Sequence, residues 1–467
     1  MGQVDKKIFF IFLLALFLRF LVFFPFIYKH PERAFYTIDA YTYEFPAITL
    51  IEKGKYMNDC PRKIPDWFPQ QCTPSHEPEI YRPPIYPLYI AGHYLMFGYR
   101  PELVILTQNV LDAFKVILIY YIGRVIGLGN PYLGSVLYAI SPSGIIFSQA
   151  LMTETLQGFI LLVFILLFFR GLSVLRSAFL GIVAGILSLT HPLWYFFALI
   201  SPILVLIWTR SVKKFLVTGF FVLLTIAPWM IRNWLIWKQI IFAHFSHIFL
   251  CEIYQKMEKG KWLGDYRDID IFNEASERFG WGVKFQTEDE IRSYQTNLTE
   301  ELQVAKICME RIIRNISKYP VDVHISGFLR SFPPLGIGML YYVISGDINP
   351  SRIETTKYIA PLVLRGKILE ALKEIREKRL GLLPLPWVFI YSFSWILRIL
   401  SFIFSFAALV KMKPRFSLLL FFIFFYGTFL MITLDAGQPR RFHTVEPIIF
   451  ILASSIFSKK YLKTKSS

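Results

Sequence analysis

The run Ile8–Tyr28, IFFIFLLALFLRFLVFFPFIY, follows Lys6 and Lys7 and is long enough to cross a bilayer as a helix. It has no small-residue cleavage site, so we interpret it as a retained membrane anchor rather than a signal peptide. Of the 467 residues, 55% are hydrophobic and 18% are charged, against about a quarter charged in a typical soluble domain. The sequence therefore predicts an all-α polytopic membrane protein.

Further apolar runs predict the later spans. They cover Leu103–Val125, Pro131–Ala150, Thr155–Phe169, Ala178–Pro192, Trp194–Trp208, Phe215–Trp234, Trp387–Val410, Ser417–Leu434 and Val445–Phe457. Lys and Arg gather in alternate gaps and in the tail, as the positive-inside rule predicts for about ten or more spans with both ends in the cytoplasm. This placement accounts for the net charge of +17 without nucleic acid, for which the sequence has no binding motif.

The spans divide the chain into three parts. Residues 1–237 form an N-terminal transmembrane catalytic module with a first outer loop over 29–101, and residues 384–467 form C-terminal transmembrane helices. Residues 238–383 are more polar and predict an outer-face domain. Within it we expect a helix over Thr287–Tyr319, a membrane-surface segment over Val321–Ser345 and an interfacial amphipathic helix over Ile368–Leu380.

This topology sends a set of polar residues to the outer face, although they come from distant parts of the chain. The set comprises Asp39, Glu44, Arg82, Glu154, His191, Arg232, Asp265, Asp435, Arg440, Arg441 and His443. Positive clusters on that face run against the usual charge bias and favour an anionic ligand such as a lipid-linked phosphate.

Asp39 begins a segment in which Tyr41, Phe45 and Ile48 follow at helical spacing, which predicts an interfacial helix. A carboxylate at its N-terminal end is suited to general-base work, and it is equally suited to capping the helix. Glu44 is interpreted as a surface residue of the same helix.

Arg82 precedes the Pro83-Pro84 turn. Its guanidinium matches phosphate oxygens, with a lipid-headgroup anchor as the alternative. Glu154 at a span start indicates either a functional acid or a carboxylate at a helix N-terminus.

His191 ends another span, and no HxxxH or His/Cys cluster accompanies it. The sequence therefore names no metal site and no cofactor, with a divalent metal left open as an alternative. Cys60 and Cys72 bracket a short outer loop, where a disulfide is permitted and reduced cysteines are the alternative.

Several motifs occur together in order along the chain. They are Asp39-Ala40-Tyr41-x-Tyr43, Arg82-Pro83-Pro84-x-Tyr86-Pro87-Leu88, Phe97-Gly98, Ser141-Pro142, Thr153-Glu154, Pro228-Trp229-x-x-Arg232-Asn233, Ala305 through Tyr319-Pro320, and Arg440/Arg441 to Pro447. Their combination resembles the membrane glycosyltransferases of the C-type fold, relatives of the protein O-mannosyltransferases and of the lipid A aminoarabinose transferase. The resemblance implies an enzyme of the plasma membrane that moves a sugar from a polyprenyl-phosphate carrier to an acceptor on the outer face.

The resemblance also implies roles for individual residues. Asp39 would activate the acceptor, with Glu154 as the second acidic residue, and Arg82 would contact the carrier phosphate. Arg440 or Arg441 would assist the phosphate, with Arg441 the better match. The substrate-binding set implied by the matching positions is Arg82, Tyr86, Tyr43, His191, Arg232, Arg440 and Arg441.

Two departures leave the sugar and the acceptor open. Asp39-Ala40 stands where those branches have two adjacent acids, and His191-Pro192 stands where many relatives have Arg-Pro. The expected partners are a polyprenyl-phosphate sugar donor, membrane lipids and a glycan, lipid or protein acceptor. The Trp-Trp-Asp signature of oligosaccharyltransferases is absent, which disfavours transfer of a whole glycan to asparagine.

The alternative function is a transporter or flippase for a lipid-linked anion. Transporters usually show related halves and polar groups at mid-membrane, whereas this sequence shows no repeat and predicts polar groups at one face. A non-catalytic scaffold of the same fold is a third alternative, against which the intact Asp39 argues.

Overall fold

The computed structural model describes residues 5–35, 38–59, 77–128, 130–243, 246–259, 268–294, 297–315, 337–346, 362, 365–379, 381, 383–411, 419–428 and 439–455. Over these ranges the regular secondary structure is helical apart from one short antiparallel pair of strands, in which Met57 lies opposite Pro78. The predicted all-α class is confirmed.

The elements of the N-terminal half are α1 (Lys6–Val22), which continues as η1 (Phe23–Tyr28), η2 (Pro31–Ala34), α2 (Ile38–Lys53), β1 (Met57–Asn58), β2 (Glu77–Pro78), α3 (Ile85–Phe97), α4 (Pro101–Val125), α5 (Pro131–Ala139), α6 (Pro142–Phe147), α7 (Glu154–Phe169), α8 (Val174–Thr190), η3 (Pro192–Trp194), α9 (Tyr195–Thr209) and α10 (Val212–Trp237). Those of the second half are α11 (Ser246–Lys259), α12 (Ile269–Phe279), α13 (Glu288–Ser293), α14 (Leu298–Arg314), α16 (Ile337–Ser345), α19 (Ile368–Glu374), η5 (Ile375–Arg379), α20 (Leu385–Lys411), the helix Leu419–Thr428 and α22 (Pro439–Ser455).

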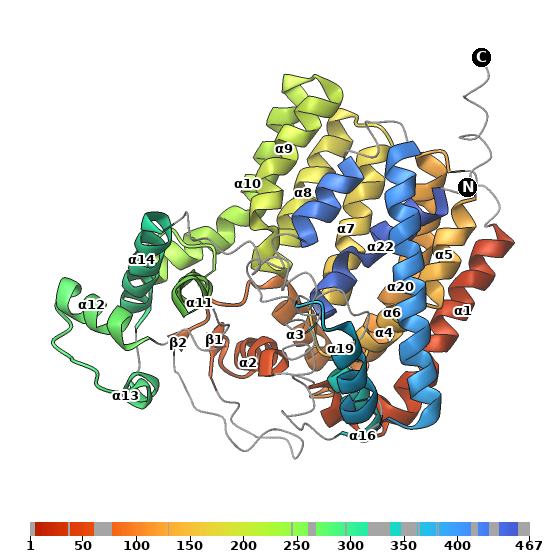
Figure 1. Ribbon diagram of the computed structural model, residues 1–467. Coiled ribbons are helices and arrows are strands. Elements are labelled where there is room, and N and C mark those ends of the chain that lie inside the picture. Colours follow the sequence, from red (N-terminus) through yellow and green to blue (C-terminus); the bar gives the residue numbers. More distant parts are fainter. Residues whose placement is uncertain are drawn as a thin grey trace.

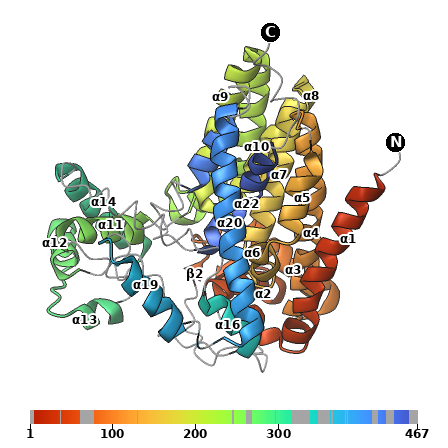
Figure 2. The same ribbon diagram turned by 45° about the vertical axis from the view of Figure 1, so that its right-hand side comes forward.

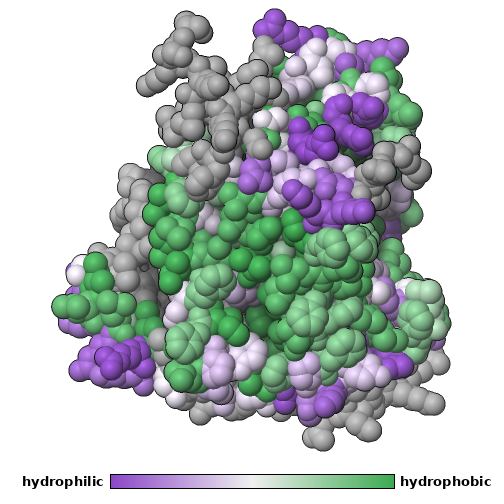
Figure 3. Space-filling view, turned by 90° about the vertical axis from the view of Figure 1, so that its right-hand side faces the viewer, coloured by the Kyte–Doolittle hydropathy of each residue, from purple (hydrophilic) through white to green (hydrophobic). Residues whose placement is uncertain are grey.

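Five helical stretches of the described chain are long and apolar enough to cross a membrane. They are Lys6–Tyr28, Pro101–Val125, Pro192–Thr209, Val212–Trp237 and Leu385–Ala408, and shorter apolar helices lie over Glu154–Phe169, Val174–Thr190, Leu419–Thr428 and Phe442–Ser454. Figure 3 shows what this composition does to the surface: a broad apolar band covers the face on which α1 lies, with hydrophilic patches above and below it. A surface of this kind suits contact with lipid and supports a multi-pass membrane protein.

The long helices stand side by side as one bundle, and α1 begins and α22 ends in its upper half (Figure 1). Helices α2, α3, α16 and α19 lie at the opposite end, while α11–α14 project to one side (Figures 1 and 2). The shorter elements between the long helices thus lie at this end and at one side of the bundle (Figures 1 and 2).

Helices α8 and α10 pack closely because glycines face the contact. A Cβ on Gly185 would lie 2.6 Å from Cβ of Thr225, and the Thr218 hydroxyl donates to the Ser177 carbonyl across the same interface at 3.2 Å. In lipid no hydrophobic driving force brings helices together. Membrane helices therefore often pack through small residues that let their backbones approach closely.

Two predicted helices are broken in the structure. The predicted span Pro131–Ala150 is two short helices, α5 and α6, because Pro142 lacks the N–H that would continue the helix through Ser141. The described part of the predicted helix Thr287–Tyr319 contains two helices, α13 and α14, and residues 295–296 and 316–319 lie outside the described residues. Asn297 caps the new start: its side chain accepts from the Glu300 N–H and the Glu300 carboxylate accepts from the Asn297 N–H.

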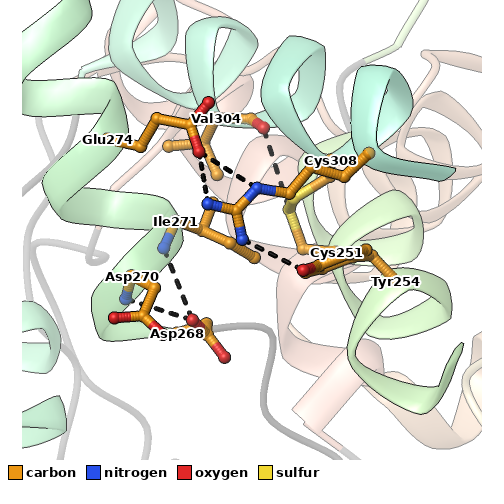
Figure 4. Close-up of a disulfide and its surroundings, with 9 residues drawn as sticks. Cys251, Tyr254, Asp268, Asp270, Ile271, Glu274, Val304 and Cys308 are labelled. Carbon is orange, nitrogen blue, oxygen red and sulfur yellow. Dashed lines mark hydrogen bonds and ion pairs between the residues drawn. A yellow bond between two sulfur atoms is a disulfide. The ribbon is translucent and has the colours of Figure 1, made fainter. Parts of the chain in front are cut away.

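A disulfide joins Cys251 of α11 to Cys308 of α14 (Figure 4). Beside it, Arg311 donates to the Glu274 carboxylate and to the Tyr254 hydroxyl, so α11, α12 and α14 are tied at one point. The sequence analysis did not predict this bridge, since the two cysteines lie 57 residues apart and form no motif.

Candidate functional site

Asp39 and Arg82 are in direct contact at the end of the bundle where α2 and α3 lie (Figure 1). Asp39 lies in the first turn of α2, and Arg82 lies just before α3. The Nη2 of Arg82 donates to Oδ1 of Asp39 at 2.6 Å, and its Nε donates to the Thr42 hydroxyl at 2.8 Å. Arg82 is 5% exposed, whereas the Asp39 side chain keeps 24% of its surface open. The two residues that the sequence assigns to separate roles thus form one ion pair with its carboxylate at the surface.

The Arg82 guanidinium is fixed from several sides. Its Nη1 donates to the Tyr43 hydroxyl at 3.1 Å, and its Cζ lies 4.4 Å from the centre of the Tyr43 ring. Burial alone would lower the pKa of Arg82, but the neighbouring Tyr43 and Asp39 raise it above its usual value. The group therefore stays cationic, as an anion-binding residue must.

A buried carboxylate shapes the backbone before Arg82. Glu79 Oε1 accepts from the backbone N–H of Tyr81 at 2.5 Å and from that of Arg82 at 2.8 Å, and the Tyr56 hydroxyl donates to the Arg82 carbonyl at 2.7 Å. Burial raises the pKa of Glu79 to about 7, against the lowering effect of these bonds and of Arg82. The turn that presents Arg82 is thus held by polar contacts, in addition to the stiffness of Pro83-Pro84.

Tyr43 and Tyr86 continue the site inward. Their rings meet edge to face at 5.2 Å, and the Tyr86 hydroxyl donates to Gln108 Oε1 at 2.5 Å. Burial raises the pKa of Tyr86 well above its usual value, and nearby Tyr89 and Glu154 add to the shift. Glu154, the first residue of α7, is 2% exposed. The structure thus brings Asp39, Arg82, Tyr43, Tyr86 and Glu154 into one neighbourhood.

Arg232 supports the site from α10. Its Nη2 donates to the Tyr56 carbonyl at 3.0 Å and its Nη1 donates to the Glu79 carbonyl, while its Cζ lies 4.9 Å from the Trp229 ring centre. These contacts fasten α10 to the strands before Arg82.

His191 ends α8 and is buried. Its Nδ1 accepts from the Leu193 N–H at 3.3 Å, which starts the turn η3. This bond gives His191 a local role in starting the turn after α8.

Several predicted site residues fall partly or wholly outside the description. Arg440 and Arg441 lie in the first turn of α22, but their side chains are outside the described residues. Cys60, Cys72, Asp265 and Asp435 lie wholly outside them. Within the described ranges, no group of three or more His, Cys, Asp or Glu residues could hold a metal ion.

The interpretation of Glu44 as a surface residue is wrong. Its side chain is 0% exposed and accepts a short hydrogen bond from the Tyr94 hydroxyl. Burial raises the pKa of Glu44 from 4.5 to about 8, and the bond from Tyr94 opposes the shift. The helical pattern of α2 failed at this position because α3 covers the face that the sequence assigned to solvent.

This buried acid makes stability depend on pH. A carboxyl whose pKa is raised keeps its proton in the folded protein while the unfolded chain releases it, so stability is expected to fall as pH rises from 4.5 to about 8 and then to level off. Glu44→Gln removes this titration and keeps an acceptor for Tyr94. We expect its melting temperature in detergent to vary less with pH than that of the wild type and to be higher than that of the wild type at alkaline pH. The free energy of unfolding of Glu44→Gln should exceed that of the wild type there by up to a few kcal/mol. Glu52→Gln on the same helix is the control, and an equal pH slope in Glu44→Gln and wild type would contradict the assignment.

A second group of charged side chains lies inside the bundle. Asp112 of α4 accepts from Arg19 of α1, at 2.8 Å from Nε and 2.6 Å from Nη2, and lies 2.6 Å from Lys115 Nζ. The Tyr138 hydroxyl donates to the other Asp112 oxygen at 2.7 Å. Arg19, Asp112 and Lys115 are each 0% exposed.

The same group continues to α20 and α22. Arg398 Nη2 donates to Glu446 Oε1 at 2.5 Å, and the Ser143 hydroxyl donates to Glu446 Oε2. His443 lies between the two carboxylates, with ring nitrogens 3.5 Å from Asp112 Oδ1 and 3.5 Å from Glu446 Oε2. We call Arg19, Asp112, Lys115, Arg398, His443 and Glu446 the buried charge cluster.

The sequence analysis missed this cluster, apart from His443, which it placed on the outer face and which the structure buries in the bundle. At 1.5 Å per residue, Asp112 lies roughly 16 Å along α4 from Pro101, near the middle of a bilayer. The available signal was the presence of charges inside apolar runs, which marks functional or structural groups by default. The positive-inside rule, which predicts the topology, considers only charged residues in the gaps between spans. It therefore says nothing about charged residues inside the spans.

No family model matches the sequence. No curated protein matches it either. Among solved structures, the chain is similar to ArnT from Cupriavidus metallidurans in the apo state, with 11% identity and a TM-score of 0.33 over 80% of this chain and 76% of that one. A likeness at this level carries no argument. The fold and the site by themselves define a polytopic helical membrane protein with a carboxylate–guanidinium pair at one end of its bundle.

Proposed function

We propose that this protein is a membrane glycosyltransferase that moves a sugar from a polyprenyl-phosphate donor to an acceptor at the outer face of the membrane, where Asp39 and Arg82 would lie. The contact between Asp39 and Arg82 carries the proposal. It joins a carboxylate that reaches the surface to a cation buried beside it. The motif resemblance, which includes both residues, supports the same reaction.

The chemistry follows from what each group does best. The acceptor hydroxyl or amine gives its proton to Asp39 as its oxygen or nitrogen attacks the anomeric carbon. The bond from that carbon to the phosphate oxygen breaks, and the carrier leaves as polyprenyl phosphate with its new charge beside Arg82. This single displacement inverts the configuration at the anomeric carbon. The reaction consumes only the donor and the acceptor.

The resting ion pair has a role in this sequence. A donor phosphate competes with Asp39 for the guanidinium, because an arginine fork holds phosphate in the same way as carboxylate. Binding of the donor then frees the carboxylate next to the reacting carbon. Glu154 and Tyr86 extend the site toward the bundle, where the phosphate end of a lipid carrier would arrive from the bilayer.

A transporter or flippase of a lipid-linked anion is the second candidate. The observation that favours it is the buried charge cluster, because ionisable groups at mid-membrane often mark a transport path. Its cations and carboxylates are paired with one another, which suits a structural role equally well.

The two functions separate in one experiment. The purified protein in liposomes is given radiolabelled polyprenyl-phosphate sugars, with and without a membrane extract as the acceptor source. We expect free polyprenyl phosphate to appear only when the acceptor is present. Movement of the intact sugar lipid between leaflets, with no cleavage in either condition, would instead establish the transporter.

A further inference from the structure

A hollow of about 400 Å³ lies where the end of α10 meets the domain built by α12 and α14. Trp237, Phe279 and Trp281 line it with aromatic rings, and Thr299, Glu300 and Gln303 line it with polar groups. Its volume falls in the range of small-molecule sites, and its mixture of rings and hydrogen-bonding groups is typical of them.

The Trp281 ring is held in a fixed orientation. Its Nε1 donates to Gln303 Oε1 at 2.7 Å, and the ring lies parallel to that of Tyr294, at 12° and 6.3 Å between centres. An indole fixed at the edge of a hollow offers a rigid apolar platform with an electron-rich face. Such a platform attracts the C–H face of a sugar ring.

One polar group of the hollow is enclosed and has no partner within the described part of the chain, namely the Trp237 indole N–H. Beside it, the side chains of Thr299 and Gln303 line the hollow with further polar groups. An enclosed donor without an acceptor is destabilising, and a ligand oxygen would supply the missing acceptor. Hydroxyl groups, which both donate and accept, could bond to Trp237 and to these two side chains.

The charge of the hollow excludes a phosphate as its natural occupant. No Lys or Arg is among the residues that line it in the described ranges. Its one carboxylate, Glu300, already accepts from the Tyr294 hydroxyl at 2.9 Å and from the Asn297 N–H at 2.9 Å. The lining therefore favours a neutral, polyhydroxylated ligand.

The hollow is connected to the Asp39–Arg82 pair through α14 and through α10. Glu301 follows the lining residue Glu300 on α14, and its Oε2 accepts from the Tyr81 hydroxyl at 2.8 Å. Tyr81 directly precedes Arg82. Helix α10, which supplies Trp237, also holds the strands before Arg82 through Arg232.

From these observations we propose that the hollow binds a neutral saccharide, and specifically the glycan part of the acceptor. Its identification as an acceptor subsite rests on the proposed function, whereas saccharide binding itself does not. Trp281 would stack on a pyranose ring, and Thr299, Gln303 and Trp237 would bond its hydroxyl groups.

Saccharide binding can be measured without any transfer reaction. Protein carrying Asp39→Asn, in lipid nanodiscs without donor, is titrated with maltotriose, mannobiose and chitobiose and followed by saturation-transfer NMR. We expect at least one of these probes to bind, and Trp281→Ala to weaken binding by roughly tenfold, the scale of a lost aromatic contact. Trp281→Phe should restore part of the affinity. Trp234→Ala, three residues from Trp237 on α10 and 51% exposed, should leave it unchanged.

Thr299→Val tests the same site without removing a ring, and it should also weaken binding of the same probe. The proposal is overturned if no probe binds, or if Trp281→Ala and Thr299→Val bind as tightly as their parent. Binding in a protein that otherwise proves unable to transfer sugar would leave the saccharide site standing and refute the proposed function. Transfer that saturates with acceptor identically in Trp281→Ala and wild type would leave the proposed function standing and refute the identification of the hollow as an acceptor subsite.

Discussion

Asp39→Asn is expected to reduce the rate of sugar transfer by about 10²- to 10⁴-fold, the usual contribution of a positioned general base. Asparagine keeps an oxygen for the Nη2 of Arg82 but cannot take a proton from the acceptor. The loss should therefore fall on kcat, with little change in the KM for the donor. The measurement is release of polyprenyl phosphate under saturating donor, at matched amounts of folded protein.

Glu52→Gln is the matched control, because it removes a carboxylate from the same helix. Its described hydrogen bond is to Tyr99, away from Arg82. It should transfer at close to the wild-type rate. Normal transfer by Asp39→Asn would remove Asp39 from the catalytic role, and the proposed mechanism with it.

Asp112→Asn is expected to lower the stability of the protein by about 3–5 kcal/mol, the largest effect of any single substitution considered. The change leaves Arg19 and Lys115 buried without the carboxylate that both contact at 2.6 Å. Buried charges that lose a partner cost far more than exposed ones, since neither water nor salt reaches them. The melting temperature and the yield of monodisperse protein in detergent measure the loss.

The double variant Asp112→Asn, Lys115→Met provides the decisive comparison. It removes one cation along with one anion, so the balance of the buried charge cluster returns to that of the wild type. We expect it to recover a large part of the stability lost by Asp112→Asn. If the double variant melts lower still, the cluster is held by geometry that charge balance does not explain.

The buried charge cluster also bears on the reaction site. Arg398 and Glu446 join α20 to α22, and Arg19 and Asp112 join α1 to α4. The first turn of α22 contains Arg440 and Arg441, the cations expected to assist the carrier phosphate. The cluster fixes the position of α22 against its neighbours and therefore fixes the positions of Arg440 and Arg441. It does not itself contact the substrate.

The sequence predicts structural elements correctly where a local pattern of residue types determines them. Apolar runs predict membrane helices because the bilayer demands about 20 apolar residues in a row, and α1, α4 and α20 follow that rule. The amphipathic spacing after Asp39 predicts α2, and the Pro-Pro turn predicts the start of α3 at Ile85. Pattern reasoning also selected Asp39 and Arg82 separately, one as an acid at a helix start and the other as a cation before a rigid turn.

Other features required knowledge of which faces meet. The burial of Glu44 depends on α3 lying over α2, and the Cys251–Cys308 bridge depends on α11 packing against α14. Ser141-Pro142 was visible as a motif, but the apolar character of the whole run concealed the break between α5 and α6.

By itself, then, the sequence determined that this protein is a helical membrane protein and which residue types lie near one end of its spans. Hydrophobicity and charge act residue by residue, so they can be read without a fold. Only the tertiary structure decided that the Asp39 carboxylate meets the Arg82 guanidinium, and that charges from α1, α4, α20 and α22 neutralise one another inside the bundle. Such pairings arise from helices that lie far apart in the chain, and their energy depends on distance and burial, neither of which the order of residues contains.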